Sequence, residues 1–207
     1  MNEPQNVLLI DDHPMVNSGI KTILEETGRF RVTGQANTLE GAKLFITNRR
    51  DAFPFLIILD IILGEDNGLD FLPFLNEYCN DNEINKPPVL ICSVLEEPYR
   101  IQSALDMGAA GFISKVSSET ELLQAIDSIL RGEIYISGEH SVKVAKSHGY
   151  YSKFTKREMQ IINLIKRNKT NKQIAIELRL SIRTIENHIS NIYYKTGTKD
   201  RQEIMVF

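Results

Sequence analysis

The sequence contains few cysteines and no long apolar segment, and both absences exclude classes of protein. Cys79 and Cys92 are the only two cysteines, and their spacing is not that of a metal site. We expect both thiols to stay reduced, as in an intracellular chain. No apolar run approaches the roughly 20 residues that span a bilayer, so no membrane association is expected. The start of the chain, Met1–Gln5, lacks the basic and apolar regions of a secretory signal.

Two further absences concern motifs and repeats. No G-x-G-x-x-G pattern follows the first apolar run, which argues against a dinucleotide-binding enzyme. The sequence also shows no long internal repeat and no low-complexity tract. A repeat array or an extended disordered protein is therefore not expected.

Charge is distributed unevenly along the chain, although the net charge is only −3. Residues 1–151 contain 12 lysines and arginines against 22 aspartates and glutamates, a net charge of −10. Residues 152–207 contain 12 basic against 5 acidic residues, a net charge of +7. This asymmetry predicts two domains with different partners, and the basic one is a candidate for binding a polyanion.

The first part of the chain, residues 1–137, alternates short apolar runs with segments of helical periodicity. The expected strands are Val7–Ile10, Phe30–Ala36, Phe53–Asp60, Val89–Val94 and Gly111–Ser114. Pro14 suits the start of the first helix, and Asn37 with Glu40 resembles a capping box for the second. Five rounds of strand and helix predict an α/β fold with a five-stranded, doubly wound parallel sheet.

Acidic residues end two of the most apolar strands of this predicted sheet. Asp11 and Asp12 follow the first strand, and Asp60 ends the third. Carboxylates at neighbouring strand ends converge on the ligand-binding edge of an open α/β sheet, where they repel one another unless a cation lies among them. Their oxygen ligands suit Mg²⁺. An ionised Asp60 needs no general base, so we expect it to accept a phosphoryl group as a nucleophile.

Two other strand ends carry residues that suit phosphoryl transfer. Ser93 near the end of the fourth strand can donate a hydroxyl hydrogen bond, and Lys115 after the fifth can neutralise a phosphoryl oxygen. Taken singly, Asp11 and Asp12 could cap a helix, Ser93 could be an ordinary strand hydroxyl and Lys115 a surface lysine. Their combination at four strand ends favours the functional interpretation.

The last part of the chain, residues 153–207, is expected to form a small helical domain after a linker at 138–152. Thr155 and Glu158 have capping-box spacing, and Ser181 precedes a longer amphipathic segment. This segment has isoleucines at helical spacing, which predict a buried stripe: Ile182, Ile185, Ile189 and Ile192. Short helices with tight turns indicate a helix-turn-helix domain.

The opposite face of that last long helix is polar and basic. Arginine and asparagine read base edges, whereas lysine and serine or threonine hold phosphates. The candidate DNA contacts are Lys172, Arg183, Thr184, Glu186, Asn187, Ser190, Asn191 and Lys195. A solvated polar helix face would look similar, but the net charge of +7 favours double-stranded DNA.

The first part resembles the receiver domain of bacterial two-component response regulators. The matching segments are Leu9–Pro14, Leu59-Asp60 with Gly68, Ser93, and Gly108–Lys115. The resemblance implies a flavodoxin-like fold with Asp60 as phosphoacceptor. It also implies Mg²⁺ held by Asp11, Asp12, Asp60 and the Ile62 carbonyl, with Ser93 and Phe112 as the switch residues. One departure is Gly64, which stands where the family usually has proline.

The last part is similar to the LuxR-type helix-turn-helix of the NarL/FixJ group. The matching segments are Phe154–Glu158, Asn171–Ala175, Leu180-Ser181 and Arg183–Ile189. The resemblance implies DNA contacts at Glu186, Asn187 and Ser190. The fourth helix, which often forms the dimer contact in this group, is short here.

Together these features predict a cytoplasmic response regulator. A sensor histidine kinase would phosphorylate Asp60, and the altered receiver would pair with a second copy or release the DNA-binding domain to control transcription. Asp60 would catalyse only its own modification, so we do not expect an enzyme. Two alternatives stay open: a DNA-binding regulator that does not depend on phosphorylation, and a phosphatase that passes through an aspartyl phosphate.

Overall fold

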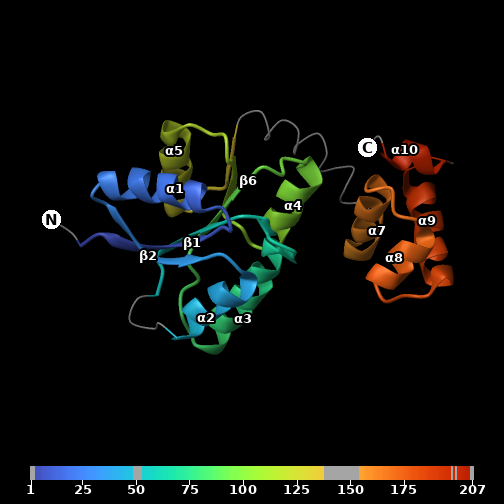
Figure 1. The fold of residues 1–207 in the computed structure, drawn as a ribbon, viewed down its shortest axis with the longest axis horizontal. Helices are drawn as coiled ribbons and strands as arrows, with labels where there is room; N and C mark the ends of the chain where they lie inside the picture. The colour runs from blue at the N-terminus through green and yellow to red at the C-terminus, as the bar shows by residue number, and fades with distance from the viewer. Residues whose placement is uncertain (1–2, 49–52, 138–153, 197, 199, 206–207) are drawn as a thin grey trace. The chain divides into compact units, whose positions relative to one another are not determined.

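The structure is a computed structural model that describes residues 3–48, 53–137, 154–196, 198 and 200–205. The chain divides into two compact units, Met1–Ala145 and Lys146–Phe207 (Figure 1). The predicted linker at 138–152 lies outside the described residues.

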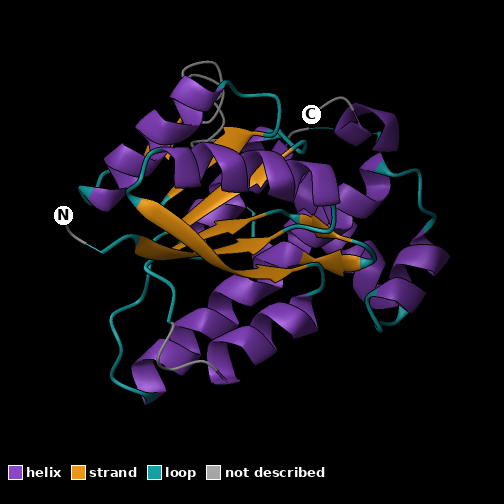
Figure 2. Ribbon diagram, turned by 60° about the vertical axis from the view of Figure 1, so that its left-hand side comes forward, coloured by secondary structure: helices purple, strands orange, loops and turns teal. Residues whose placement is uncertain are grey.

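The first unit is built on a parallel sheet with helices on both faces (Figure 2). Its strands are β1 (Gln5–Ile10), β2 (Phe30–Ala36), β3 (Leu56–Leu59), β6 (Val89–Ser93), β7 (Gly111–Ser114) and β8 (Tyr135–Ile136). Their order in the sheet is β2-β1-β3-β6-β7-β8. The predicted fold class is confirmed, with six strands in place of five. The additional strand, β8, pairs in parallel with β7.

Two layers of helices cover the sheet. The helices are α1 (Pro14–Glu26), α2 (Leu39–Asn48), α3 (Phe71–Asp81), α4 (Pro98–Asp106) and α5 (Glu119–Leu130). Alternate residues of β1 face opposite layers. Val7 and Leu9 pack in the cluster that holds α1 and α5, whereas Leu8 and Ile10 pack with α2, α3 and α4. Burial on both sides explains why β1 is continuously apolar from Val7 to Ile10.

The start of α2 differs from the sequence prediction by one residue. Asn37 and Glu40 were expected to form its capping box, but Thr38 occupies the capping position. The Thr38 hydroxyl accepts a hydrogen bond from the Gly41 amide at 3.1 Å. Its carbonyl accepts the first helical bond, from Ala42. Threonine can cap a helix as asparagine does, so the sequence alone left the register of this cap ambiguous.

The strand order reverses between β1 and β3, and this reversal positions the site. From β1 the chain continues to β2 on one side, whereas β3 lies on the other side of β1. In open α/β sheets, ligands bind at the carboxyl ends of the strands where the order reverses. Asp11 follows β1 and Asp60 follows β3, so both leave the sheet at this point.

A short hairpin follows Asp60. Its strands β4 (Ile62–Leu63) and β5 (Asp66–Asn67) are antiparallel and lead into the 3-10 helix η2 (Gly68–Asp70). Gly64 lies in its turn with φ of +60°, a left-handed conformation that glycine adopts readily. Gly68 packs so closely that an added Cβ would lie 2.0 Å from the Asp60 carbonyl oxygen.

The second unit consists of α7 (Lys156–Lys166), α8 (Asn171–Glu177), α9 (Ile182–Thr196) and α10 (Arg201–Met205). Thr155 and Glu158 form the predicted capping box, and Thr170 with Gln173 forms a second one. Three isoleucines of the predicted stripe, Ile185, Ile189 and Ile192, are buried. The prediction for the fourth was wrong: Ile182 is 45% exposed, because this first residue of α9 lies outside the packed cluster.

Candidate functional site

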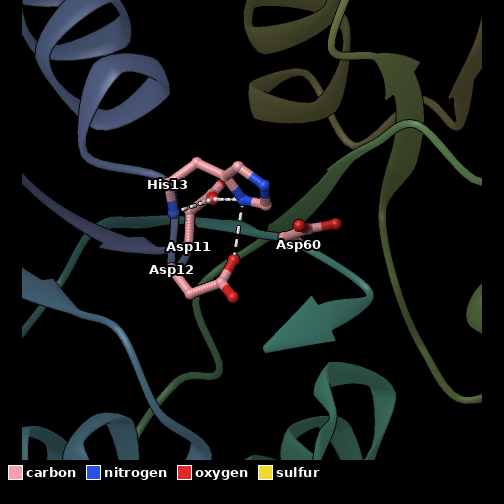
Figure 3. A group of neighbouring side chains, drawn as sticks. All are labelled: Asp11, Asp12, His13 and Asp60. Carbon is pink, nitrogen blue, oxygen red and sulfur yellow. Dashed lines mark hydrogen bonds and ion pairs between the residues drawn. The ribbon is translucent and has the colours of Figure 1, made fainter. Parts of the chain in front are cut away.

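Three aspartates meet at the carboxyl ends of β1 and β3 (Figure 3). Asp11 and Asp60 are almost fully buried, whereas Asp12 is partly exposed. The register of the sheet brings them together: Ile10 pairs with Leu59, and the Asp60 amide donates to the Ile10 carbonyl at 2.8 Å. The carboxylates therefore crowd because each follows directly from a paired strand end.

Lys115 supplies the positive charge within this group. Its Nζ lies 2.6 Å from Asp60 Oδ2 and 2.7 Å from Asp11 Oδ2, and its side chain is only 6% exposed. The Lys115 amide donates to the Ser93 carbonyl, which anchors the residue just beyond β7. Burial alone would lower the pKa of this ammonium, but its hydrogen bonds to Asp11 and Asp60 outweigh that effect and raise the pKa. The lysine is thus held in its charged form.

Asp60 and Asp12 each have Oδ2 fixed by a donor and a buried Oδ1 that accepts no hydrogen bond from the described residues, although His13 Nδ1 approaches Asp12 Oδ1 to ion-pair distance. Asp60 Oδ2 accepts from Lys115, whereas the buried Asp60 Oδ1 has no hydrogen-bond partner among the described residues. Asp12 Oδ2 accepts from the Gly64 amide at 2.9 Å. A buried carboxylate oxygen without a donor is costly unless a ligand satisfies it. The donor set therefore fits a hard dication such as Mg²⁺.

His13 joins this cluster, although the sequence interpretation gave it no role. Its Nδ1 lies 2.7 Å from Asp12 Oδ1 and 3.1 Å from Asp11 Oδ1 (Figure 3). Its amide also donates to Asp11 Oδ1 at 2.8 Å. One carboxylate or imidazole atom from each of Asp11, Asp12, His13 and Asp60 lies within 4.8 Å of the others. The position of His13 directly after an aspartate pair was the sequence signal that could have identified this residue as part of the site.

The two predicted switch residues, Ser93 and Phe112, are both buried. The Ser93 hydroxyl accepts a hydrogen bond from the Leu95 amide at 3.3 Å, and Phe112 packs in the cluster that contains α4. Ile62 is the first residue of β4, two residues past Asp60. Burial raises the pKa of the neighbouring Cys92 thiol to about 12, so this cysteine stays neutral.

The predicted DNA contacts on α9 share one exposed face of that helix. Arg183, Glu186, Asn187, Ser190 and Asn191 are exposed, at spacings of three and four residues. Thr184 is half-buried, and its hydroxyl lies 2.7 Å from the Ser181 hydroxyl. Lys172 is exposed on the neighbouring α8.

Lys195 differs from the other predicted contacts because its ammonium is engaged inside the domain. It donates to Glu158 Oε2, and this joins the start of α7 to the end of α9. Burial favours the neutral form of Glu158, but the Lys195 bond and the Thr155 cap outweigh burial and lower the pKa of this carboxyl. We therefore leave Lys195 out of the proposed DNA-binding face.

No helix in the described part of the chain is long and apolar enough to cross a bilayer.

Comparisons with known proteins match both units. A family model described as a response regulator receiver domain matches residues 7–127, and one described as bacterial regulatory proteins of the luxR family matches residues 152–207. Transcriptional regulatory protein LiaR of Bacillus subtilis is 29% identical, covering 97% of this chain and 95% of the relative. Response regulator protein VraR of Staphylococcus aureus is 28% identical, covering 97% and 94%.

Solved structures share the fold at lower identity. RcsB of Salmonella enterica serovar Typhimurium, bound to promoter rprA with the phosphomimetic BeF3-, has a TM-score of 0.67 at 20% identity and covers 98% of this chain and 96% of that one. A LuxR-family response regulator from Aurantimonas sp. SI85-9A1 has a TM-score of 0.61 at 23% identity, covering 70% and 98%. This chain belongs to the two-component response regulators, in which a receiver domain precedes a LuxR-type DNA-binding domain that controls transcription.

Proposed function

We propose that Asp60 accepts a phosphoryl group from a sensor histidine kinase and that this event regulates DNA binding by the second domain. The observation that carries the proposal is the Asp60 side chain, which is buried and bound to Lys115 through Oδ2 but accepts no hydrogen bond on Oδ1 from any residue that the structure describes. One carboxylate thus combines a cation for the incoming group with an oxygen that is free to attack phosphorus.

The proposed Mg²⁺ ligands are Asp11, Asp12, Asp60 and the Ile62 carbonyl. Bound Mg²⁺ would offset the negative charge of the phosphoryl oxygens. Three carboxylates within one small cluster support this, because Lys115 alone leaves them with an excess of negative charge. Lys115 would exchange one carboxylate partner for a phosphoryl oxygen and keep its charge in the process.

The proposed switch passes through Ser93 and Phe112. The Ser93 hydroxyl would turn from the Leu95 amide toward a phosphoryl oxygen, and Phe112 would occupy the space that this movement opens. Phe112 packs against the layer that contains α4, so its displacement would alter the surface of α4 and β7. Such a change shifts a population between two packed states, which requires a differential stability of a few kcal/mol.

The proposed DNA-binding element is the exposed face of α9, with Arg183, Asn187 and Ser190 toward the major groove and Lys172 of α8 toward phosphate. Support comes from the exposure of these side chains and from the basic charge of this part of the chain. We propose that the phosphorylated protein forms a homodimer and binds two half-sites about one helical turn apart.

The test combines gel shift and sizing of full-length wild type and Asp60→Asn, each with and without Mg²⁺ and a small phosphodonor. We expect the wild type to gain mass as a dimer and to bind DNA more tightly only when Mg²⁺ and donor are both present. Asp60→Asn should show neither change. Equal DNA binding by both proteins under all conditions would overturn the proposal and favour a regulator that does not depend on phosphorylation.

A further inference from the structure

We propose that His13 is a ligand of the dication at the aspartate cluster, and that it tunes the site toward first-row transition dications that accept imidazole, such as Co²⁺ and Zn²⁺. The inference deepens the proposed function, since it rests on the same ion site. It adds a nitrogen donor to a set of ligands that is otherwise made of oxygens.

Two carboxylate oxygens of the cluster remain available to a ligand. The Gly64 amide holds Asp12 Oδ2, and Lys115 holds Asp60 Oδ2. Asp12 Oδ1 and Asp60 Oδ1 are both buried and lack a hydrogen bond within the described residues. These two oxygens are therefore the atoms that a ligand would satisfy, and His13 Nδ1 is 2.7 Å from one of them.

The donor atoms are also spaced to fit one ion. His13 Nδ1 lies 2.7 Å from Asp12 Oδ1 and 3.1 Å from Asp11 Oδ1. Adjacent donors around an octahedral dication with bonds near 2.1 Å lie about 3 Å apart. The three atoms are thus spaced as neighbouring ligands of one ion, and the wider limit of 4.8 Å brings Asp60 into the same set.

The His13 ring does not cap α1, and its polar contacts are to residues of the site: Asp11, Asp12 and Lys115, whose Nζ lies 3.3 Å from His13 Nδ1. His13 precedes α1 with an extended backbone, φ −98° and ψ 105°, and its side chain makes no capping hydrogen bond to the helix. Its amide is fixed by Asp11 Oδ1, which holds the Cα beside the cluster. The side chain is 59% exposed, so the ring has room to rotate and present Nδ1 to an ion.

A ligating imidazole and a merely neighbouring one affect different ions differently. Imidazole nitrogen suits zinc, nickel, copper and related ions, whereas carboxylate and carbonyl oxygens suit Mg²⁺. A His13 that only occupies the space between the carboxylates would compete with every dication to the same degree. A His13 that ligates would strengthen the binding of Co²⁺ and leave Mg²⁺ nearly unaffected. The ratio of the two affinities therefore reports ligation.

The experiment measures Mg²⁺ and Co²⁺ affinities of the full-length protein by titration calorimetry, together with the visible absorption of bound Co²⁺. The variants are His13→Ala, His13→Asn, which offers an oxygen in place of nitrogen, and Met15→Ala, a control on an 88% exposed neighbour. We expect both His13 variants to lose about tenfold or more in Co²⁺ affinity and less than about twofold in Mg²⁺ affinity. The Co²⁺ spectrum should change in both, and Met15→Ala should match the wild type.

The remaining three of the four histidines are present in every variant, so any Co²⁺ bound elsewhere cancels in the comparison. Parallel changes in Mg²⁺ and Co²⁺ affinity, or an unchanged Co²⁺ spectrum, would overturn the role of His13 as a ligand. Those results would leave the proposed function intact as long as Mg²⁺ binds. A wild type that binds no Mg²⁺ would instead contradict the ion site of the proposed function itself.

Discussion

At the scale of single residues, Lys115 holds the site together. Its ammonium contacts two buried carboxylates, from Asp11 and Asp60, that would otherwise repel each other. A buried charge that loses its partner is far more destabilising than an exposed one. The residue that we propose to neutralise the phosphoryl group therefore also stabilises the receiver before any phosphoryl group arrives.

Replacing Lys115 by methionine should destabilise the receiver by about 3–5 kcal/mol, because Asp11 and Asp60 would be left buried without a cation. Urea unfolding of the full-length protein checks this. Added Mg²⁺ should restore more stability to this variant than to the wild type, since the ion can take over part of the neutralisation. The control is Lys21→Met on α1. If Lys115→Met loses no more unfolding free energy than the control, the buried carboxylates do not need the Lys115 ammonium for stability.

Gly68 is required for a different reason, the close approach of its Cα to the backbone of Asp60. An added Cβ would meet the Asp60 carbonyl oxygen at 2.0 Å. We expect Gly68→Ala to destabilise the receiver by about 1–3 kcal/mol, measured by urea unfolding, and to slow phosphorylation by a small donor.

The matched control for Gly68 is Gly19→Ala in α1, where an added Cβ meets nothing within 4 Å. This change should stabilise the protein by about 0.5–1 kcal/mol, because alanine is the better helix former. The same sign of effect at both positions would contradict the steric explanation.

At the scale of elements, the β4–β5 hairpin contributes to the ion site through its backbone. Gly64 has a left-handed φ and donates its amide to Asp12. Proline, which the family usually has here, can do neither. Gly64→Pro should therefore weaken Mg²⁺ binding about tenfold by calorimetry, as expected when a supporting hydrogen bond to a ligand is lost.

Gly64→Asn is the control for this prediction, since asparagine keeps the amide proton and tolerates a left-handed backbone. Its Mg²⁺ affinity should stay close to that of the wild type. If both variants bind Mg²⁺ equally well, the hairpin does not orient Asp12.

The ion pair between Glu158 and Lys195 joins α7 to α9 in the second domain. Because the folded pKa of Glu158 is lowered from an ordinary value near 4.5, its ionised form stabilises the fold above that pH, and this stability is lost as the pH falls through the folded pKa. Glu158→Gln should be less stable than the wild type by about 0.5–1 kcal/mol at pH 7, with the difference vanishing in acid.

Urea unfolding followed by circular dichroism at pH 7 and below pH 4 measures this difference. Gln retains the ability to cap α7, so the comparison isolates the charge. The control is Glu177→Gln, an exposed residue of α8. A difference that persists in acid would assign the effect to packing and not to ionisation.

Element boundaries show where the sequence was sufficient. Phe30–Ala36 and Gly111–Ser114 were predicted and occur with the same bounds. Every residue of Gly111–Ser114 is buried, as in a strand covered on both faces, whereas Phe30–Ala36 is buried only at its two end residues. β8 was missed because two residues, Tyr135 and Ile136, are too short to show a period. The cap of α2 was misplaced because Asn37 and Thr38 can both serve, and only the backbone register chooses between them.

At the scale of the whole molecule, the chain couples an acidic half to a basic half. The proposed signal passes from one to the other by pairing of phosphorylated receivers. We expect phosphorylation to raise the affinity for DNA with two half-sites one helical turn apart much more than for DNA with one half-site. Gel shifts of the phosphorylated and unphosphorylated protein on both DNAs test this. An equal gain in affinity on both DNAs would favour release of the DNA-binding domain over pairing of the receivers.

The charged residues of the site could be predicted from the sequence, whereas the way they support one another could not. Asp11, Asp60 and Lys115 each follow an apolar strand, so topology alone brings them together. The Gly64 bond to Asp12 depends on a backbone amide, which residue types do not reveal. His13 carries no signal beyond its place in the chain, and its approach to two carboxylates depends on its backbone conformation.

The proposed phosphoacceptor site is assembled from residues far apart in the chain, so its parts emerge in a fixed order during synthesis. Asp11 and Asp60 leave the ribosome before Lys115, so a chain that ends before β7 lacks the ammonium that pairs with both carboxylates. The DNA-binding domain emerges later still. A chain that ends before β7 therefore lacks both Lys115 and the DNA-binding domain, whereas a chain that ends between the two matched regions keeps the receiver alone.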